Sequence, residues 1–293
     1  MNRLLCLLAL SVLCIWSPLA GQEFSGGFRA GLNFTTISGP SEMGAGGGEL
    51  EEYRISNGFH IGAIANVRFT DVFRLRGELL FSQKGGVYGY TGDSYWVFRP
   101  LDGSEPFVAT GNRETTLEVT NSYIDIPVTG VARLGKFELS AGMSVGFLVG
   151  SKAAGEVRFA GQTPLGNAVD PFVIVLDYDY LANPFNEADA VQAGVRRLDS
   201  KDVAIPETLG AYYEGVDTDE NLFNTIDIGL VGGVAYYLNQ GLFMGLRLNY
   251  GLSDVTNEAR DISRQEINGA QGYTFRDDKD QNLNLQLSVG FSF

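Results

Sequence analysis

His60 is the only histidine of the 293-residue chain, so histidine-dependent hydrolase or acyltransferase chemistry would have to use it as the base. Such enzymes place a serine within hydrogen-bond reach of the ring and a third group that orients it. An inward-facing His60 would have Glu78 or Asp125 as orienting neighbours and Ser82 as the candidate nucleophile. Nothing in the local sequence fixes that geometry. We therefore expect a hydrogen-bonded interior histidine and no catalytic residue.

Metal and cofactor chemistry has few residues to use. Both cysteines, Cys6 and Cys14, lie within the first twenty residues, and one histidine without a thiol does not make a zinc site. Segments 217–221 and 278–282 begin like a calcium-binding loop. Each has leucine where the sixth-position glycine belongs, and neither has a glutamate at position twelve. We therefore expect no cofactor and no metal site, and specific calcium binding stays open as an alternative.

The start of the chain predicts export. Arg3 is followed by an apolar stretch from Leu4 to Trp16 and by small residues near Ala20, which is the pattern of a secretory signal peptide over residues 1–20. Cleavage there leaves a mature chain without cysteine, so we expect no disulfide.

The formal net charge of −14 argues against a nucleic-acid partner, whose phosphates the chain would repel. The excess of acid is concentrated in two segments. Residues 151–222 hold thirteen Asp or Glu against five Lys or Arg, and residues 253–280 hold seven against four. We expect these segments to form an acidic surface that contacts outer-membrane lipid and lipopolysaccharide through divalent cations.

Eight segments alternate polar and apolar residues with a period of two, which indicates strands with two different faces. Each is longer than the roughly 9 to 11 residues that a tilted strand needs to cross a bilayer. No later segment has the roughly 18 consecutive apolar residues of a membrane helix. The eight segments are residues 26–37, 57–69, 73–85, 121–134, 137–150, 224–238, 242–253 and 281–293.

Short and long connections between these segments alternate without exception. Three pairs of segments are joined only by TDV, GK or NQG, whereas residues 38–56, 86–120, 151–223 and 254–280 are long connections. We therefore predict an all-β fold, an eight-stranded antiparallel up-and-down transmembrane β-barrel over residues 23–293. Its short turns would be periplasmic and its long loops extracellular.

The rival fold is a soluble lipocalin-like barrel with an apolar interior. The polar faces of the segments are crowded with glycine, for example Gly62 and Gly142, which suits a narrow interior. The apolar faces carry bulky residues such as Leu246 and Tyr250, more than an eight-stranded interior can hold. We therefore expect the apolar faces in lipid, with aromatic residues gathered near strand ends.

The same alternation places charged residues in the lumen, where they must pair, form hydrogen bonds or be hydrated. We predict a salt-bridge plug centred on Glu78 and Arg247, the two charges nearest mid-strand. The alternative is a polar conduit or a ligand site. The predicted lumen network is Arg29, His60, Arg76, Glu78, Asp125, Asp227 and Arg247, and Arg68, Arg74, Arg133 and Glu138 are also placed inside.

Residues 151–223 are long for a featureless loop. Asn186 could cap a short helix over residues 187–198, which has acids at its start and arginines at its end. Residues 171–180 are apolar enough to form a strand above the membrane. We expect a folded cap that offers a surface to an extracellular or envelope protein partner.

Residues 121–150 and 226–257, with a last strand ending in Phe293, resemble the PorT-like, porin-family outer-membrane β-barrel domain. The most specific parts are the proline-containing stretch from Tyr123 to Val128 and the sequence YGLSDV. The resemblance implies an eight-stranded barrel in a Gram-negative outer membrane. It also implies insertion by the barrel-assembly machinery, which reads a last strand ending in an aromatic, so Phe291 and Phe293 would carry the insertion signal.

We expect a monomeric protein of the cell outer membrane that binds or scaffolds through its acidic extracellular loops. We do not expect a general diffusion pore, because eight strands leave an interior just wide enough for side chains. Two alternatives stay open. The resemblance implies that the chain could be an outer-membrane component of a gliding-associated secretion apparatus. The second alternative is a lipid-modifying outer-membrane enzyme that uses His60.

Overall fold

The computed structural model describes residues 23–44, 47–181, 190–211, 221–257, 264–268, 272–275 and 279–293. The predicted signal peptide lies outside them. Every helix or strand element of the described residues is a β-strand. Within these ranges no helix has the length and apolarity needed to cross a membrane. The strands are β1 (Glu23–Ser38), β2 (Glu51–Arg54), β3 (Ser56–Arg68), β4 (Phe73–Phe98), β5 (Phe107–Leu134), β6 (Phe137–Gln162), β7 (Ala168–Asp179), β8 (Ala190–Leu198), β9 (Lys201–Leu209), β10 (Ile226–Tyr237), β11 (Leu242–Gly251), β12 (Arg264–Asn268), β13 (Gly272–Phe275) and β14 (Gln281–Ser292).

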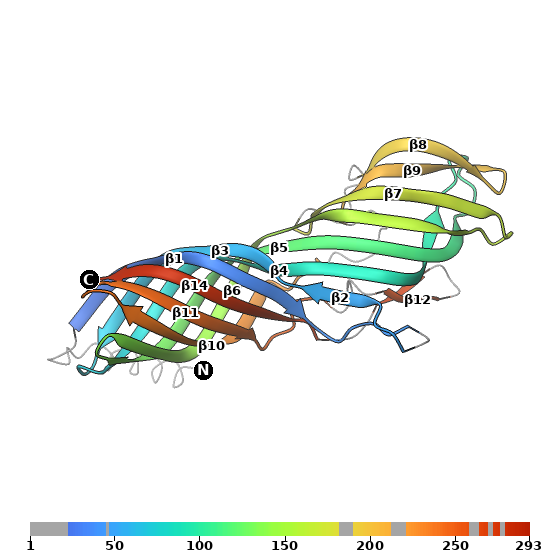
Figure 1. The fold of residues 1–293 in the computed structure, drawn as a ribbon. Coiled ribbons are helices and arrows are strands. Elements are labelled where there is room, and N and C mark those ends of the chain that lie inside the picture. The colour runs from blue at the N-terminus through green and yellow to red at the C-terminus, as the bar shows by residue number, and fades with distance from the viewer. Residues whose placement is uncertain are drawn as a thin grey trace, which may run out of the picture.

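Eight strands pair into a closed antiparallel ring, in the order β1, β3, β4, β5, β6, β10, β11 and β14 (Figure 1). The pairing of β14 with β1 runs from Gly27 opposite Ser292 to Ser38 opposite Gln281, and β6 pairs with β10 to complete the circuit. Each of the eight alternating sequence segments contributes one strand. Because every strand has a neighbour on both sides, this part of the sheet has no free edge.

The register of the ring fixes its dimensions. Paired residues followed once around the ring from Thr35 lead back to β1 at Ser25, ten residues earlier. With a rise of about 3.3 Å per residue and a spacing of about 4.8 Å between strands, this stagger tilts the strands by about 40° and sets a radius of about 8 Å. Side chains that point inward from such a radius fill the interior.

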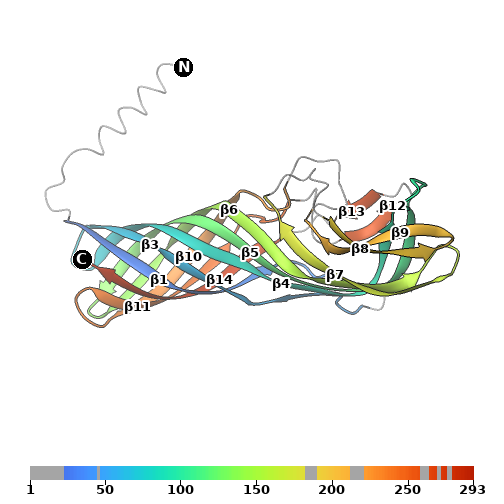
Figure 2. The same cartoon turned by 90° about the horizontal axis from the view of Figure 1, so that it is seen from above.

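Tight turns close the ring at the end where the first and last described residues lie (Figure 2). Glu23 pairs there with Arg68, the last residue of β3, at 2.8 Å. The turn between β5 and β6 uses Gly135 with a positive φ of 64°, a conformation that glycine adopts without steric cost. Asn239 Oδ1 accepts from two backbone N–H groups in the turn between β10 and β11.

β4, β5 and β6 run far beyond the ring, where other strands join them in the same sheet (Figure 1). We call this outer part of the sheet the extension. It comprises residues 86–120 of β4 and β5, residues 151–162 of β6, and β2, β7, β8 and β9. At its far tip Pro100 forms a bridge with Val203 of β9, so the sheet curls back on itself.

The extension corrects the sequence prediction for two long connections. The sequence predicts loops over residues 86–120 and 151–223, but the described parts are mostly strand. The apolar residues of this region are buried on one face of the extension instead of lying in lipid. Residues 171–180 do form a strand, β7, as predicted.

The helix predicted over residues 187–198 is wrong in the part that the structure describes. From Ala190 onward this segment is β8, which pairs antiparallel with β9. Gly194 and the β-branched Val191 and Val195 lower the helix propensity. Pairing with β9 satisfies the backbone hydrogen bonds that a helix would otherwise have supplied.

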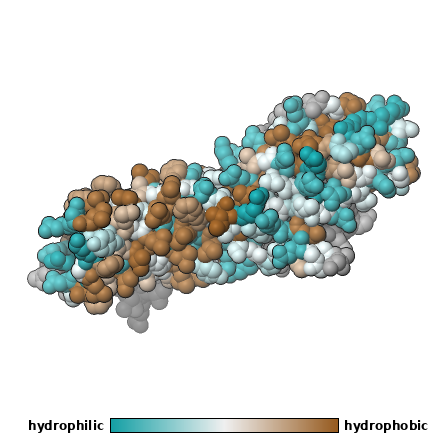
Figure 3. Space-filling model, in the orientation of Figure 1, coloured by the Kyte–Doolittle hydropathy of each residue, from teal (hydrophilic) through white to brown (hydrophobic). Residues whose placement is uncertain are grey.

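β4, β5 and β6 change the kind of side chain that they bury where they leave the ring. Ring strands expose apolar side chains and bury polar ones, whereas the extension buries an apolar face, and Figure 3 shows the apolar surface concentrated over the ring. A bulge next to Ser122 and Tyr123 shifts the buried face of β6 by one residue. The boundary is marked by Lys84, Asn121 and Ser151, which are at most 2% exposed.

The apolar surface of the ring has the height of a membrane. The outward residues of β14 and the terminal Phe293 are all apolar from Leu283 onward, a length that at a tilt of about 40° corresponds to about 25 Å.

The core of the extension is rich in aromatic side chains. Trp96 and Phe172 lie 5.3 Å apart between ring centroids, and burial of each such side chain contributes about 1.5–3 kcal/mol.

Candidate functional site

Ion pairs form three levels inside the ring. At the level nearest the tight turns, the Arg76 guanidinium donates to both oxygens of Glu138 at 2.6 and 2.9 Å. Asn66 Oδ1 accepts from Arg76 Nε at 2.8 Å, and the Tyr237 hydroxyl donates to Glu138 at 3.0 Å. These residues come from β3, β4, β6 and β10, so the level links several strands of the ring.

The middle level is centred on Glu78. Its carboxylate accepts from Arg247 at 3.0 and 2.5 Å and from Arg29 at 3.4 Å, and Arg29 also donates to Ser288 Oγ. The three charged side chains are at most 4% exposed. Two guanidiniums therefore share one carboxylate, and the structure brings together the predicted pair Glu78 and Arg247.

The third level lies at the boundary with the extension. Lys84 Nζ donates to Asp125 and Asp227 at 2.9 Å each, and Asn282 donates to Asp227 at 3.0 Å. The ammonium also lies 4.7 Å from the centre of the Tyr123 ring. Lys84 is missing from the predicted network, although its even number places it on the inward face of the segment 73–85. Lys84 neutralises the two predicted aspartates, Asp125 and Asp227.

Asn33 fixes the tautomer of His60. Its Nδ2 donates to the backbone carbonyls of Phe59 and Gln83 at 3.2 and 2.7 Å. Because carbonyls only accept, Asn33 Oδ1 is the atom that faces His60 Nδ1 at 2.7 Å, and Nδ1 carries a proton. In the neutral ring, Nε2 is then a buried acceptor with no partner among the described residues.

The serine and histidine considered for catalysis are close but not arranged as a nucleophile and base. The Ser82 hydroxyl accepts from Asn33 Nδ2 at 3.1 Å, and His60 Nε2 has no hydrogen-bond partner in the described part of the chain. Asn33 orients the ring in the place considered for Glu78 or Asp125. His60 is 1% exposed, so a substrate has no access to it in this conformation.

The six predicted charged residues of the network therefore all enter ion pairs inside the ring. A charge moved out of water costs several kcal/mol unless its partner is close and well oriented, so these residues are held by one another. The levels connect β1, β4, β5, β6, β10 and β11 across the interior. The chemistry of this arrangement is mutual neutralisation of charge inside the ring.

The two predicted insertion-signal residues lie on the outer face of the ring. Phe291 stacks on Phe28 with 6.2 Å between ring centroids, and Phe293 is 74% exposed. They belong to the apolar band and contribute nothing to the interior network.

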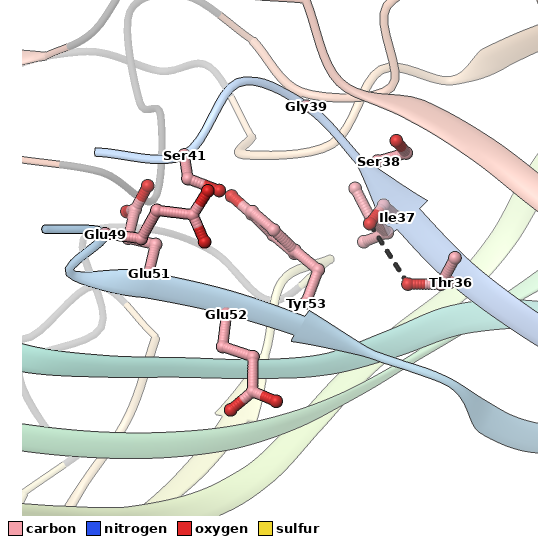
Figure 4. Close-up of a pocket in the computed structure, with 9 residues that line it drawn as sticks. All are labelled: Thr36, Ile37, Ser38, Gly39, Ser41, Glu49, Glu51, Glu52 and Tyr53. Atoms are coloured by element: carbon pink, nitrogen blue, oxygen red, sulfur yellow. Dashed lines mark hydrogen bonds between the residues drawn. The ribbon is translucent and has the colours of Figure 1, made fainter. Parts of the chain in front are cut away.

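A separate cavity of about 290 Å³ lies where β1 leaves the ring, beside β2. Ser41, Glu49 and Glu51 gather near the ring of Tyr53, while Glu52 points away (Figure 4). The carboxylate of Glu51 accepts from the Tyr88 hydroxyl at 2.9 Å and from a backbone N–H at 2.8 Å. Burial, together with the charge of Glu51, raises the pKa of Tyr88 well above its ordinary value. Glu51 thereby anchors β2 to β4.

No group of three or more histidine, cysteine, aspartate or glutamate side chains is placed to hold a metal in the described residues. Of the two calcium-like segments, residues 217–220 and 278 lie outside that part. Asn282 is committed to Asp227, and Asp280 accepts from the Thr256 hydroxyl at 3.1 Å.

The sequence of the chain matches a known protein family. The family profile described as "Outer membrane protein beta-barrel domain" matches residues 20–257. The chain belongs to this family. It is an outer-membrane β-barrel protein, and its location is the outer membrane.

The solved structures that match this chain include three that are distant from it in sequence. Ail, the attachment invasion locus protein of Yersinia pestis, in complex with the heparin analogue sucrose octasulfate, is 9% identical with a TM-score of 0.33, covering 92% of this chain and 99% of that chain. OprG from Pseudomonas aeruginosa is 10% identical with a TM-score of 0.35, covering 93% and 97%. Neisserial surface protein A is 12% identical with a TM-score of 0.29, covering 93% and 99%. These scores carry no argument about function, and a comparison with curated proteins finds no match.

Proposed function

We propose that the ring spans the outer membrane as an eight-stranded antiparallel barrel, with its tight turns in the periplasm and the extension outside the cell. In this arrangement the protein binds or scaffolds a partner through the extension. The proposal rests on one observation: the ring exposes its apolar side chains, whereas the extension buries them. An apolar outer surface about 25 Å high requires lipid, whereas the outer face of the extension requires water.

The interior supports a closed barrel that acts through its outside parts. The ring holds three levels of paired charges, and its single histidine is enclosed by Asn33 and the barrel wall. A diffusion pore needs a continuous water column, and a hydrolase needs substrate at the base. Neither requirement is met by a lumen filled with ion pairs, so the binding role belongs to the extension.

The surface available to a partner is acidic. Glu114 and Glu118 of β5, Glu156 of β6 and Asp177 of β7 are on the exposed face of the extension. Such a face would repel the anionic groups of lipopolysaccharide directly but would accept them through divalent cations. A basic protein surface is the other partner chemistry that fits this face.

The topology is tested by labelling single cysteines on whole cells with a membrane-impermeant thiol reagent. The mature chain has no cysteine of its own, so each introduced thiol reports alone. We expect Leu165→Cys, at the exposed turn between β6 and β7, to react, because it would face the medium. Asn239→Cys in the turn between β10 and β11 should react only after the outer membrane is permeabilised. Equal labelling of the two positions on intact cells would overturn the orientation.

The binding role is tested with a photo-crosslinking amino acid placed on the extension. We expect position 118 or 156 to give a discrete protein or lipopolysaccharide adduct in intact outer membranes. The control at Leu287 faces lipid and should give only phospholipid adducts. A companion protein of a secretion apparatus would be seen as a discrete protein adduct of constant mass. If the extension positions give no adduct beyond that of the control, the binding role is refuted.

A further inference from the structure

Two cations at the turn end of the ring lack the carboxylate partners that the deeper cations have. Arg29, Arg76, Lys84 and Arg247 each have a carboxylate oxygen within 3.4 Å. Arg74 and Arg133 form no ion pair in the described residues. The adjacent Glu138 is already occupied by Arg76 and the Tyr237 hydroxyl. Two guanidiniums at this mouth of the ring are therefore not neutralised by a paired carboxylate.

The unmatched guanidiniums are neighbours. Arg74 on β4 is opposite Val131 on β5, so Arg133 is its diagonal neighbour on the same face of the sheet. Arg133 lies 3.8 Å from the centre of the Tyr237 ring, and its Nε donates to the Gly135 carbonyl at 3.4 Å. Arg74 Nε is buried and has no hydrogen-bond partner among the residues that the structure describes.

A third cation follows Arg133 closely in the sequence. Lys136, in the turn between β5 and β6, is exposed and lies 5.8 Å from the ring centre of Tyr236. Arg74 and Arg133, on the inward face of β4 and β5, and Lys136, in the turn after β5, thus gather at one part of the rim of the ring, which we call the arc. Arginine forks and lysine ammonium groups both bind phosphate oxygens.

The outer side of the same arc is apolar. Its exposed residues are Phe73 at 59%, Leu134 at 58% and Phe137 at 61%, and Phe137 packs against Tyr236 with 5.1 Å between centroids. Aromatic residues of this kind sit at the level of lipid headgroups. A lipid whose acyl chains lie along this surface would bring its phosphate to the arc.

We propose that Arg74, Arg133 and Lys136 form a binding site for the phosphate of an anionic phospholipid, which we name the mouth site. The assignment to the inner leaflet of the outer membrane rests on the proposed topology, whereas the site itself does not. The lipid phosphate supplies the negative charge that the protein omits at this level. It also ties the tight turns to the membrane surface.

The test is native mass spectrometry of the full folded chain in detergent, titrated with dioleoyl phosphatidylglycerol, dioleoyl phosphatidylcholine or inorganic phosphate. We expect phosphatidylglycerol to bind more tightly than phosphatidylcholine. In R74Q/R133Q its affinity should fall about tenfold for each guanidinium removed, because a charge-assisted hydrogen bond is lost each time. R74K/R133K should keep most of the affinity, since it keeps the charge.

The matched control is R68Q, which removes an arginine at the same end of the ring that is already paired with Glu23 at 2.8 Å. Its affinity should stay within twofold of the wild-type value, and heat-modifiable gel mobility reports whether each variant folds. Equal binding of the two lipids, or equal losses in R68Q and R74Q/R133Q, would refute the mouth site. Displacement of phosphatidylglycerol by millimolar inorganic phosphate would refute the lipid as its occupant. Failure of the topology test would leave the binding result intact and move the lipid to the other leaflet.

Discussion

At the scale of single residues, Glu78 is the carboxylate that pairs with two guanidiniums in the middle of the ring. It is the only carboxylate that the structure places beside the guanidiniums of Arg29 and Arg247 in the described residues, and its side chain is 1% exposed. Removing it leaves two cations close together in an interior that water does not screen. A buried ion pair contributes modestly as a pair, but breaking it by removing one partner is expensive.

We therefore expect Glu78→Gln to lower the free energy of unfolding by about 3–5 kcal/mol, measured by urea unfolding of the purified barrel in detergent. The control Glu118→Gln, on the exposed face of the extension, should stay within about 0.5 kcal/mol of wild type. The double variant E78Q/R247Q should recover part of the loss, because one unpaired guanidinium remains instead of two. Wild-type stability of E78Q would contradict the proposed role of the network.

Residue alternation alone could predict which charged residues point inward, but not which of them meet. Glu78 and Arg247 belong to strands that are not neighbours, so their contact depends on the ten-residue stagger of the whole ring. Lys84 was missed because it stands at the end of its predicted segment, where alternation is weakest. The role of Asn33 could not be predicted, since a neutral amide on a polar face gives no signal of the ring it will orient.

At the scale of elements, β4, β5 and β6 each belong to two environments. In the ring they expose apolar side chains on the outside, and in the extension they bury apolar side chains on one face. The eight ring strands could be predicted from sequence because their outward positions are regularly apolar, although Ile64, Leu80 and Val231 are apolar residues on the inward face. The continuation through residues 86–120 could not, because it mixes glycine and acids with its apolar residues and resembles a loop. One face of this region becomes buried only because the extension curls, and the sequence does not indicate that curvature.

Because the ring and the extension are stabilised by different contacts, we expect the extension to unfold without the ring. Trp96→Ala removes a side chain that is 5% exposed and packs against Phe172 and Phe159, so it should destabilise the extension by about 3–5 kcal/mol. We expect faster proteolysis of residues 86–120 and 151–209 in folded protein, while the ring keeps its heat-modifiable mobility. Val175→Ala, on the exposed face of β7, is the control and should leave the cleavage rate unchanged. Loss of the folded ring in W96A would show that ring and extension unfold as one unit.

At the scale of the whole molecule, charge is distributed unevenly along the axis. Described acidic residues such as Glu118, Glu156 and Asp177 lie on the extension, and most charged residues inside the ring are paired. At the turn end, Arg74 and Arg133 have no ion pair among the described residues. We expect a molecule with this charge distribution to interact at its two ends, while the ion pairs of the lumen hold the strands together.

The last prediction is that the purified protein forms no stable pore in planar lipid bilayers. A ring of about 8 Å radius is filled by inward side chains, and desolvated charges of opposite sign stay in contact instead of leaving a water column between them. We expect no steady conductance from the wild-type chain. Glu78→Ala combined with Arg247→Ala should produce brief, flickering openings, because it removes the central ion pair. The matched control, Glu114→Ala with Arg158→Ala, removes one acid and one base from the exposed face of the extension and should remain silent. A steady large conductance from the wild-type protein would mean that the three levels of ion pairs open together in a bilayer, and a conduit would then replace the closed barrel as the function of the lumen.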